Sequence, residues 1–279
     1  GMQRVGDLAW AAADQRARGF LLGATAGRTT LSGEGLQHQD GSSHLLFATV
    51  PNCIAYDPCY GYELATIIAD GTRRMLEAQE DVFYYLTVMN ENYEQPAMPA
   101  GSHEGILKGM YRLQRTAPST GASTASVQLL GSGTLLREVL AAAELLAADW
   151  GVTAEVYSVT SFSELRRDGL DVERWNRLHP AENPRRSWVE NCLHPGAGPV
   201  VAATDYLRAV PDMIRTWVPG TYVTLGTDGF GRSDTRARLR DYFEVDRHHI
   251  ALAALHALAM GNRLPRAMLM EALARYGID

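Results

Sequence analysis

Residues 27–44, GRTTLSGEGLQHQDGSSH, bring together side chains that can exchange protons. They include His38 and His44, with the carboxylates of Glu34 and Asp40 close by in sequence and few large aliphatic residues. A histidine beside carboxylates can donate or accept a proton near neutral pH, and active sites form in loops that follow strands of α/β domains. This segment is therefore the candidate catalytic loop.

Three other interpretations of the segment compete with this one. His38, Asp40 and His44 could converge on a metal ion with Glu34 nearby, but no HExxH or cysteine-containing pattern fixes their geometry, and we predict no metal site. The segment also lacks the lysine and the Ser/Thr of a P-loop, so a phosphate cradle is not indicated. A polar surface loop is the plainest alternative, because loops are generally polar.

The composition is that of a soluble globular protein. Of 279 residues, 46% are hydrophobic and 21% are charged, which is enough apolar surface for sizeable cores. The net charge of −6 argues against a nucleic-acid partner, and the basic run at 232–240 is interleaved with acids, which predicts a solvated helix face. No apolar run reaches the roughly 20 residues of a membrane span. Three cysteines without a Cys-x-x-Cys fit a reducing cytoplasm.

The elements that would position the candidate loop alternate between strand and helix. In the first half, apolar, β-branched and aromatic runs predict strands at 18–26, 52–57 and 82–89, and the loop follows the first of them. Asp57-Pro58 predicts an N-cap with proline at the first helical position, followed by a helix. Strands that alternate with helices imply parallel pairing in a covered sheet.

The second half repeats this pattern after a small-residue, polar stretch at 115–126, where we place the domain boundary. A strand in VQLLG leads through a glycine turn into a long helix stopped by Gly151, and a strand follows at 154–161. Another strand in GPVVAA precedes a helix capped at Thr204 or Asp205. The remaining predictions are a strand in TYVTLG and two closing helices, at 247–260 and 265–276. The fold class is thus α/β, with two domains, 1–120 and 121–279, each with an open, mostly parallel sheet and flanking helices.

Six stretches of the chain resemble the homodimeric type of pyruvate dehydrogenase, the thiamin-diphosphate-dependent decarboxylating component. In order along the chain they are GRTTLSGEGLQHQDG, PNCIAYDP, VFYYLTVMNENY, YSVTSFSELRRDG, ERWNRLHP and LGTDGFGRSD. More distantly, DGSSH resembles the Asp-Gly-x-Thr-His loop of transketolases. The chain is similar to the C-terminal part of that enzyme, with part of the pyrimidine-binding domain at 1–120 and a transketolase C-terminal-like domain at 121–279.

The resemblance implies oxidative decarboxylation of pyruvate and reductive acetylation of lipoamide. It implies thiamin diphosphate and Mg²⁺ as cofactors of the complete enzyme, a lipoyl domain of dihydrolipoamide acetyltransferase as partner, and a homodimer. It assigns His38 to proton transfer and to contact with substrate and cofactor, and Glu34 and Asp40 to orienting it or shaping the pocket. His44 is a weaker candidate for cofactor contact.

The same resemblance implies that this chain is inactive alone and does not bind the cofactor. The Gly-Asp-Gly…Asn signature for magnesium and diphosphate is absent, and the family's activating glutamate lies upstream of the residues present. Two alternatives stay open: part of another thiamin-dependent 2-oxo acid dehydrogenase or transketolase-like enzyme, and a non-catalytic dimerisation or interaction module. Substrate profiling and oligomeric state would distinguish them.

Overall fold

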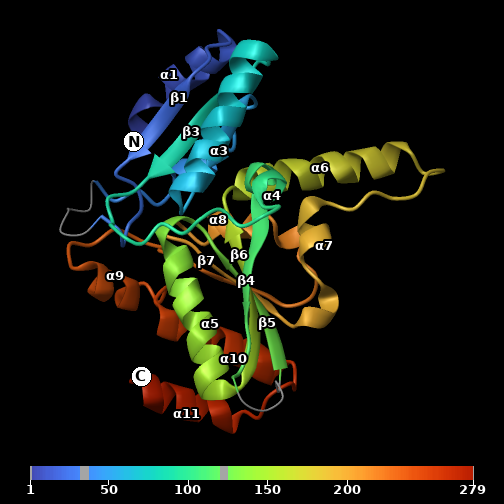
Figure 1. Cartoon of the computed structure of the whole chain (residues 1–279). Helices are drawn as coiled ribbons and strands as arrows, with labels where there is room; N and C mark the ends of the chain where they lie inside the picture. The colour runs from blue at the N-terminus through green and yellow to red at the C-terminus, as the bar shows by residue number, and fades with distance from the viewer. Residues whose placement is uncertain (1, 32–37, 120–124, 279) are drawn as a thin grey trace.

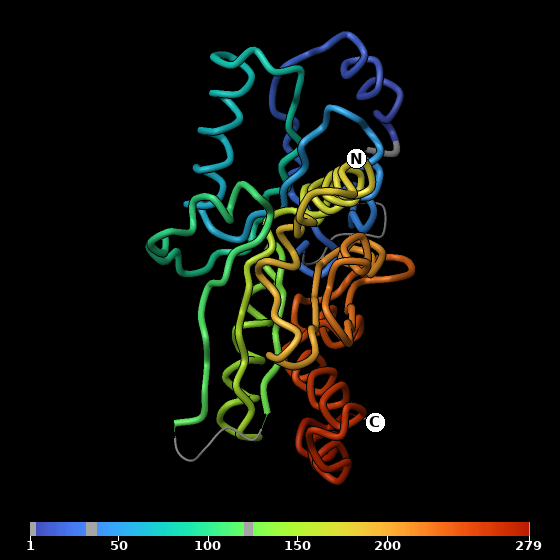
Figure 2. Tube along the Cα trace, turned by 90° about the vertical axis from the view of Figure 1, so that its right-hand side faces the viewer, coloured from blue at the N-terminus to red at the C-terminus, as the bar shows by residue number. Residues whose placement is uncertain are grey.

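The protein contains two separate β-sheets, each covered by helices. The structure is a computed structural model, and it describes residues 2–31, 38–119 and 125–278. Figure 1 shows the smaller sheet, with β1 and β3, at one end of the molecule and the larger sheet, with the C-terminal helices, at the other. Figure 2, turned by 90°, shows the same separation along the long axis. The predicted α/β class with mostly parallel sheets is confirmed.

The smaller sheet has the strand order β1-β3-β2 and is entirely parallel. Its elements and those that cover it are α1 (Met2–Asp14), β1 (Phe20–Ala24), α2 (Ser43–Phe47), β2 (Cys53–Tyr56), α3 (Gly61–Thr72), β3 (Phe83–Val88) and α4 (His103–Lys108). One face packs against α1 and α2 through residues such as Phe47 and Tyr85, and the other packs against α3 and α4 through Ile67 and Ile106. Alternate residues of β2 and β3 thus face opposite cores, which is why the sequences of these two strands are largely apolar.

The larger sheet has the strand order β4-β6-β5-β7-β8, and β4 pairs antiparallel with β6. Its elements are β4 (Met110–Thr116), β5 (Ala125–Gly131), α5 (Leu136–Trp150), β6 (Val152–Val159), α6 (Phe162–Leu178), α7 (Trp188–Cys192), β7 (Val200–Ala203), α8 (Ala209–Asp212), β8 (Tyr222–Leu225), α9 (Arg236–Tyr242), α10 (Arg247–Met260) and α11 (Ala267–Tyr276). The helices α5, α10 and α11 cover one face, and α6, α7 and α8 cover the other.

The change from one sheet to the other occurs upstream of the polar stretch at 115–126. The strand β4, which precedes that stretch, already belongs to the larger sheet through its pairing with β6. An edge strand of mixed polarity gives little signal in sequence, because its exposed side chains interrupt the apolar pattern. The division at residue 120 stays a prediction about domains, whereas the sheets divide between β3 and β4.

None of the helices among the described residues combines the length and the apolar character needed to cross a membrane.

Candidate active site

The carboxyl ends of the parallel strands of both sheets meet at one junction. Asp57 follows β2, and its backbone N–H donates to the carbonyl oxygen of Thr160, which follows β6, at 2.7 Å. Gly133, which follows β5, donates its N–H to the carbonyl oxygen of Asp57 at 3.1 Å. In open α/β sheets ligands bind outside the carboxyl ends of the strands. The candidate loop, which follows β1, enters this junction.

The base of the candidate loop is bound by Asp205, which follows β7 in the other sheet. Its Oδ1 accepts hydrogen bonds from the N–H and hydroxyl of Thr29, at 2.8 and 2.7 Å. Its Oδ2 accepts from the N–H and hydroxyl of Thr30, at 3.0 and 2.7 Å. Burial raises the pKa of Asp205, while these hydrogen bonds and the charge of Arg240 oppose the shift. The predicted helix cap at Thr204 or Asp205 is wrong, because this carboxylate binds the distant loop and the next helix begins at Ala209.

Further contacts hold the loop against the segment that follows β8. The guanidinium of Arg28 donates to the carbonyl oxygens of Thr227 and Gly229. Gln39 pairs with the backbone of Arg232 in both directions: its Nε2 donates to the carbonyl, and its Oε1 accepts from the N–H at 2.6 Å. The loop is therefore bound to the larger sheet on both sides of residues 32–37.

The predicted catalytic residues of the loop are placed as follows. The side chain of His38 is exposed, next to the buried Gln39. Glu34 lies outside the described residues. Asp40 accepts the N–H groups of Ser42 and Ser43 at 3.0 Å each, and also the hydroxyl of Ser43, so its carboxylate fixes the start of α2. Their catalytic roles stay predictions.

His44 is fully enclosed behind the loop. Its Nε2 lies 3.1 Å from Thr87 Oγ1, and its ring packs edge-on against Tyr206 at a centroid distance of 4.7 Å. Because the Thr87 hydroxyl donates to Asp57 Oδ1 at 2.6 Å, we infer that the Nε2–H of His44 donates to Thr87. Burial lowers the pKa of His44 to about 4, so the imidazole is neutral at neutral pH.

Asp57 is the site residue that sequence reasoning misassigned. The Asp57-Pro58 pair predicts a helix N-cap, but α3 begins at Gly61 after the N-cap Tyr60, so that prediction is wrong. Asp57 instead lies at the junction of the two sheets, where burial raises its pKa to about 7. An Asp-Pro pair is typical of a helix start. This carboxylate is buried only because the second sheet packs against it. No local signal could have found it.

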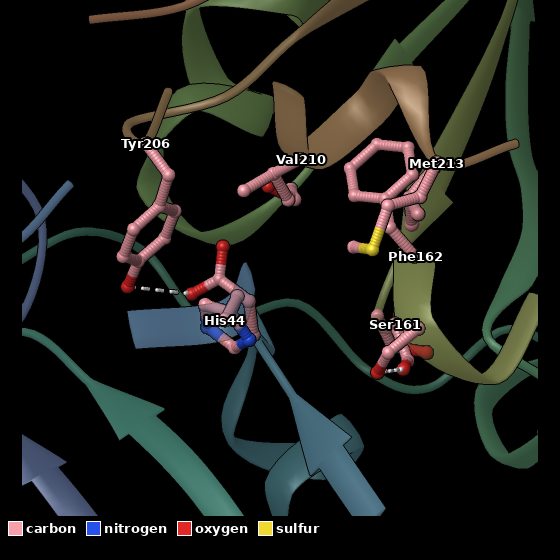
Figure 3. Close-up of a pocket in the computed structure, with 11 residues that line it drawn as sticks. His44, Ser161, Phe162, Tyr206, Val210 and Met213 are labelled. Atoms are coloured by element: carbon pink, nitrogen blue, oxygen red, sulfur yellow. Dashed lines mark hydrogen bonds between the residues drawn. The ribbon is translucent and has the colours of Figure 1, made fainter. Parts of the chain in front are cut away.

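A small cavity lies beside Asp57 and His44. Figure 3 shows Tyr206 and His44 on one side of it and Ser161, Phe162 and Met213 on the other, with the hydrogen bond from the Tyr206 hydroxyl to Asp57 Oδ1 dashed. Asp57 Oδ2 has no hydrogen-bond partner among the described residues. The cavity volume of about 10 Å³ has room for one water molecule. It cannot hold thiamin diphosphate, so these residues do not form a cofactor pocket by themselves.

The basic run at 232–240 is only partly a solvated helix face, which corrects the sequence prediction. Arg240 is buried and pairs with Glu91 and, at 3.5 Å, with Glu138. Arg236 donates from Nε to the carbonyl oxygen of Thr30 at 2.8 Å. These arginines turn toward the loop because α9 packs against the junction, which the local charge pattern does not reveal.

Comparisons with known proteins follow the same division into two parts. Residues 1–96 match the family described as pyruvate dehydrogenase E1 component, middle domain, and residues 109–246 match the transketolase-like C-terminal domain. Proteins named pyruvate dehydrogenase E1 component from Pseudomonas aeruginosa, Cupriavidus necator and Escherichia coli K12 are 61%, 59% and 54% identical over the whole of this chain. The chain spans 31% of the length of each.

Solved transketolases share the fold at much lower identity. Those of Campylobacter jejuni and Leishmania mexicana have TM-scores of 0.63 and 0.62 at 16% identity. The aligned regions cover 91% and 90% of this chain and 34% and 32% of the transketolases. The far higher identity to the E1 components favours their family over the other enzymes that share this fold. The chain belongs to the pyruvate dehydrogenase E1 family, and it corresponds to part of the middle domain followed by the transketolase-like C-terminal domain.

Proposed function

We propose that this chain supplies one wall of the active site of a pyruvate dehydrogenase that decarboxylates pyruvate and transfers the acetyl group to a lipoyl domain. The observation that carries the proposal is the 61% identity, over the entire chain, to a protein named pyruvate dehydrogenase E1 component. The family resemblance gives the complete enzyme thiamin diphosphate and Mg²⁺ as cofactors, a homodimeric state and a cytoplasmic location. The dihydrolipoamide acetyltransferase that carries the lipoyl domain would be its partner.

Within this wall, His38 is the proposed group for substrate contact and proton transfer. Its exposed position, on a loop held at the carboxyl ends of the parallel strands of both sheets, supports this role. Glu34 and Asp40 are proposed to orient His38 or shape the pocket, and the bonds from Asp40 to the start of α2 support a shaping role. His44 stays the weaker candidate for cofactor contact, since its ring is enclosed and its Nε2 faces Thr87.

The chain lacks the Gly-Asp-Gly…Asn signature for magnesium and diphosphate, and we therefore propose that it alone neither binds thiamin diphosphate nor turns over pyruvate. The first test is calorimetry of the chain with thiamin diphosphate and Mg²⁺, where we expect no heat of binding. The chain joined to the remaining two thirds of an E1 component should bind the cofactor and decarboxylate pyruvate.

The second test separates His38 from other exposed histidines. In the joined protein, His38→Ala should lower kcat/KM by roughly 10²- to 10⁴-fold, the range of general acid–base catalysis. His256→Ala is the matched control, because His256 is also exposed but lies on α10, away from the loop. Unchanged kcat/KM in His38→Ala would remove the assigned role.

A further inference from the structure

We propose that Asp205 is a positioning residue that sets the geometry of the His38 loop from the opposite sheet. The inference rests on the proposed function, because it concerns the loop on which the proposed catalytic histidine lies. Asp205 itself would touch neither substrate nor cofactor.

Among the described residues, the Asp205 carboxylate accepts hydrogen bonds only from the loop. All four side-chain hydrogen bonds to Asp205 come from two consecutive loop residues, Thr29 and Thr30, between 2.7 and 3.0 Å. Because two of the donors are backbone N–H groups, the contact fixes the direction of the main chain as it enters the loop. A carboxylate that accepts several N–H and O–H donors holds them more firmly than a neutral acceptor would.

The two threonine hydroxyls are themselves oriented from the other side. Arg240 Nε lies 3.3 Å from Thr29 Oγ1, and its Nη2 lies 3.5 Å from Thr30 Oγ1. Each hydroxyl therefore accepts from the arginine while it donates its one hydrogen to Asp205. Such a chain of donors and acceptors is polarised in one direction, which strengthens its bonds.

The far side of the loop is bound to the same part of the larger sheet. Gln39, the residue after His38, pairs with the backbone of Arg232 in the segment that follows β8. That segment is joined to Asp205, since the Thr227 hydroxyl donates to the Asp205 carbonyl at 3.1 Å. The chain segments on both sides of His38 are thus bound to one surface of the larger sheet. Among the described residues of that surface, Asp205 is the only charged side chain that binds two backbone groups of the loop.

Glu63 provides a matched control. It is also a buried carboxylate with four hydrogen bonds, and two of its donors, Tyr111 and Ser158, lie in the larger sheet. Its other two donors are the N–H groups of Cys59 and Tyr60, so none of the four comes from residues 27–44. Loss of either charge disturbs a buried bridge between the sheets, but only loss of the Asp205 charge releases the loop.

The first experiment uses this chain and needs no activity. The imidazole ¹H–¹³C resonance of His38 is assigned by its absence in His38→Ala and then recorded in Asp205→Asn and Glu63→Gln. We expect Asp205→Asn to shift or broaden the resonance and Glu63→Gln to leave it in place, with both variants compared at equal fractions below their Tm. An unchanged resonance in a folded Asp205→Asn would overturn the inference.

The second experiment is a double-mutant cycle in the joined, active protein. Asp205→Asn should lower kcat by about 10²-fold with little change in KM, because small misplacements of a catalytic group cost about that much. In the His38→Ala background the same substitution should cost less than about 3-fold, since its effect passes through His38. Equal losses in both backgrounds overturn the positioning role alone. No loss in His38→Ala by itself overturns this inference and the proposed function of His38 together.

Discussion

Gly27 is the residue whose replacement should disturb the junction most directly. Its φ is +85°, and a Cβ at this position would collide with Asp205 Oδ2. The strained backbone and the collision together should make Gly27→Ala less stable by about 2–4 kcal/mol in urea unfolding. Gly220→Ala is the control, because Gly220 also has a positive φ, +77°, but has open space at its Cβ position. Equal losses in the two variants would mean that the contact with Asp205 adds nothing.

The sequence indicates some of these residues and cannot indicate others. His38, Asp40 and His44 stand out because a polar, histidine-containing segment follows an apolar strand. Asp57 and Asp205 do not, since each looks like an ordinary helix cap after a strand. Their burial arises only when strands more than a hundred positions apart in the chain bring their carboxyl ends together.

At the scale of elements, segments rich in apolar residues were predictable, and the most polar long helix was not. The strands β1, β2, β3, β5, β6, β7 and β8 and the helices α5, α10 and α11 lie where the sequence predicts them. The long helix α6 was not predicted, and it buries only Phe162, Ser163, Leu165 and Gly169 of its 17 residues. Most of its residues are polar or charged, so no apolar run marks the segment as a core element, although its few apolar residues lie on one face.

The start of α10 offers a prediction about a single element. Asp246 Oδ1 accepts the N–H groups of His248 and His249, at 3.0 and 2.9 Å, and the ring Nδ1 of His249 at 2.9 Å. Asp246→Ala should lower the free energy of unfolding by about 1 kcal/mol at pH 7, the usual cost of losing an N-cap. Asp246→Asn keeps an N-cap acceptor and should cost clearly less.

The pH dependence of that loss follows from the carboxylate. Burial opposes the shift, but hydrogen bonds from His249 and the charges of His249 and His248 lower the pKa of Asp246 to about 2, against an ordinary value of 3.8. A lowered pKa stabilises the fold above the unfolded value and is lost as pH falls through the folded value. The difference between wild type and Asp246→Ala, measured by thermal unfolding, should therefore shrink between about pH 4 and pH 2. A constant difference would contradict the cap geometry.

At the scale of the whole molecule, the junction of the two sheets buries His44 and Asp57. Their opposite pKa shifts cancel in the pH dependence of the free energy of unfolding. Burial lowers the pKa of His44 from 6.5 to about 4 and raises that of Asp57 from 3.8 to about 7. Between about pH 4 and 6.5 the folded protein holds one proton on Asp57, while the unfolded chain holds one on His44. The pair therefore adds almost no pH dependence to stability, although each group alone would add a large one.

Single substitutions should reveal the two opposing contributions. In Asp57→Asn, the unfolded chain binds one proton more than the folded protein, on His44. Relative to wild type, the free energy of unfolding should therefore rise with pH between about 4 and 6.5, by up to about 1.4 kcal/mol per pH unit. In His44→Gln, the folded protein binds one proton more than the unfolded chain, on Asp57. The free energy of unfolding should therefore fall with rising pH by a similar slope between about 4 and 7.

Chemical unfolding at several pH values measures both slopes as differences from wild type, which removes the contributions of Glu63 and Asp205. The double variant should return to the wild-type slope, because neither titrating group remains. Two single variants that both follow the wild-type curve would show that the junction does not hold His44 neutral and Asp57 protonated.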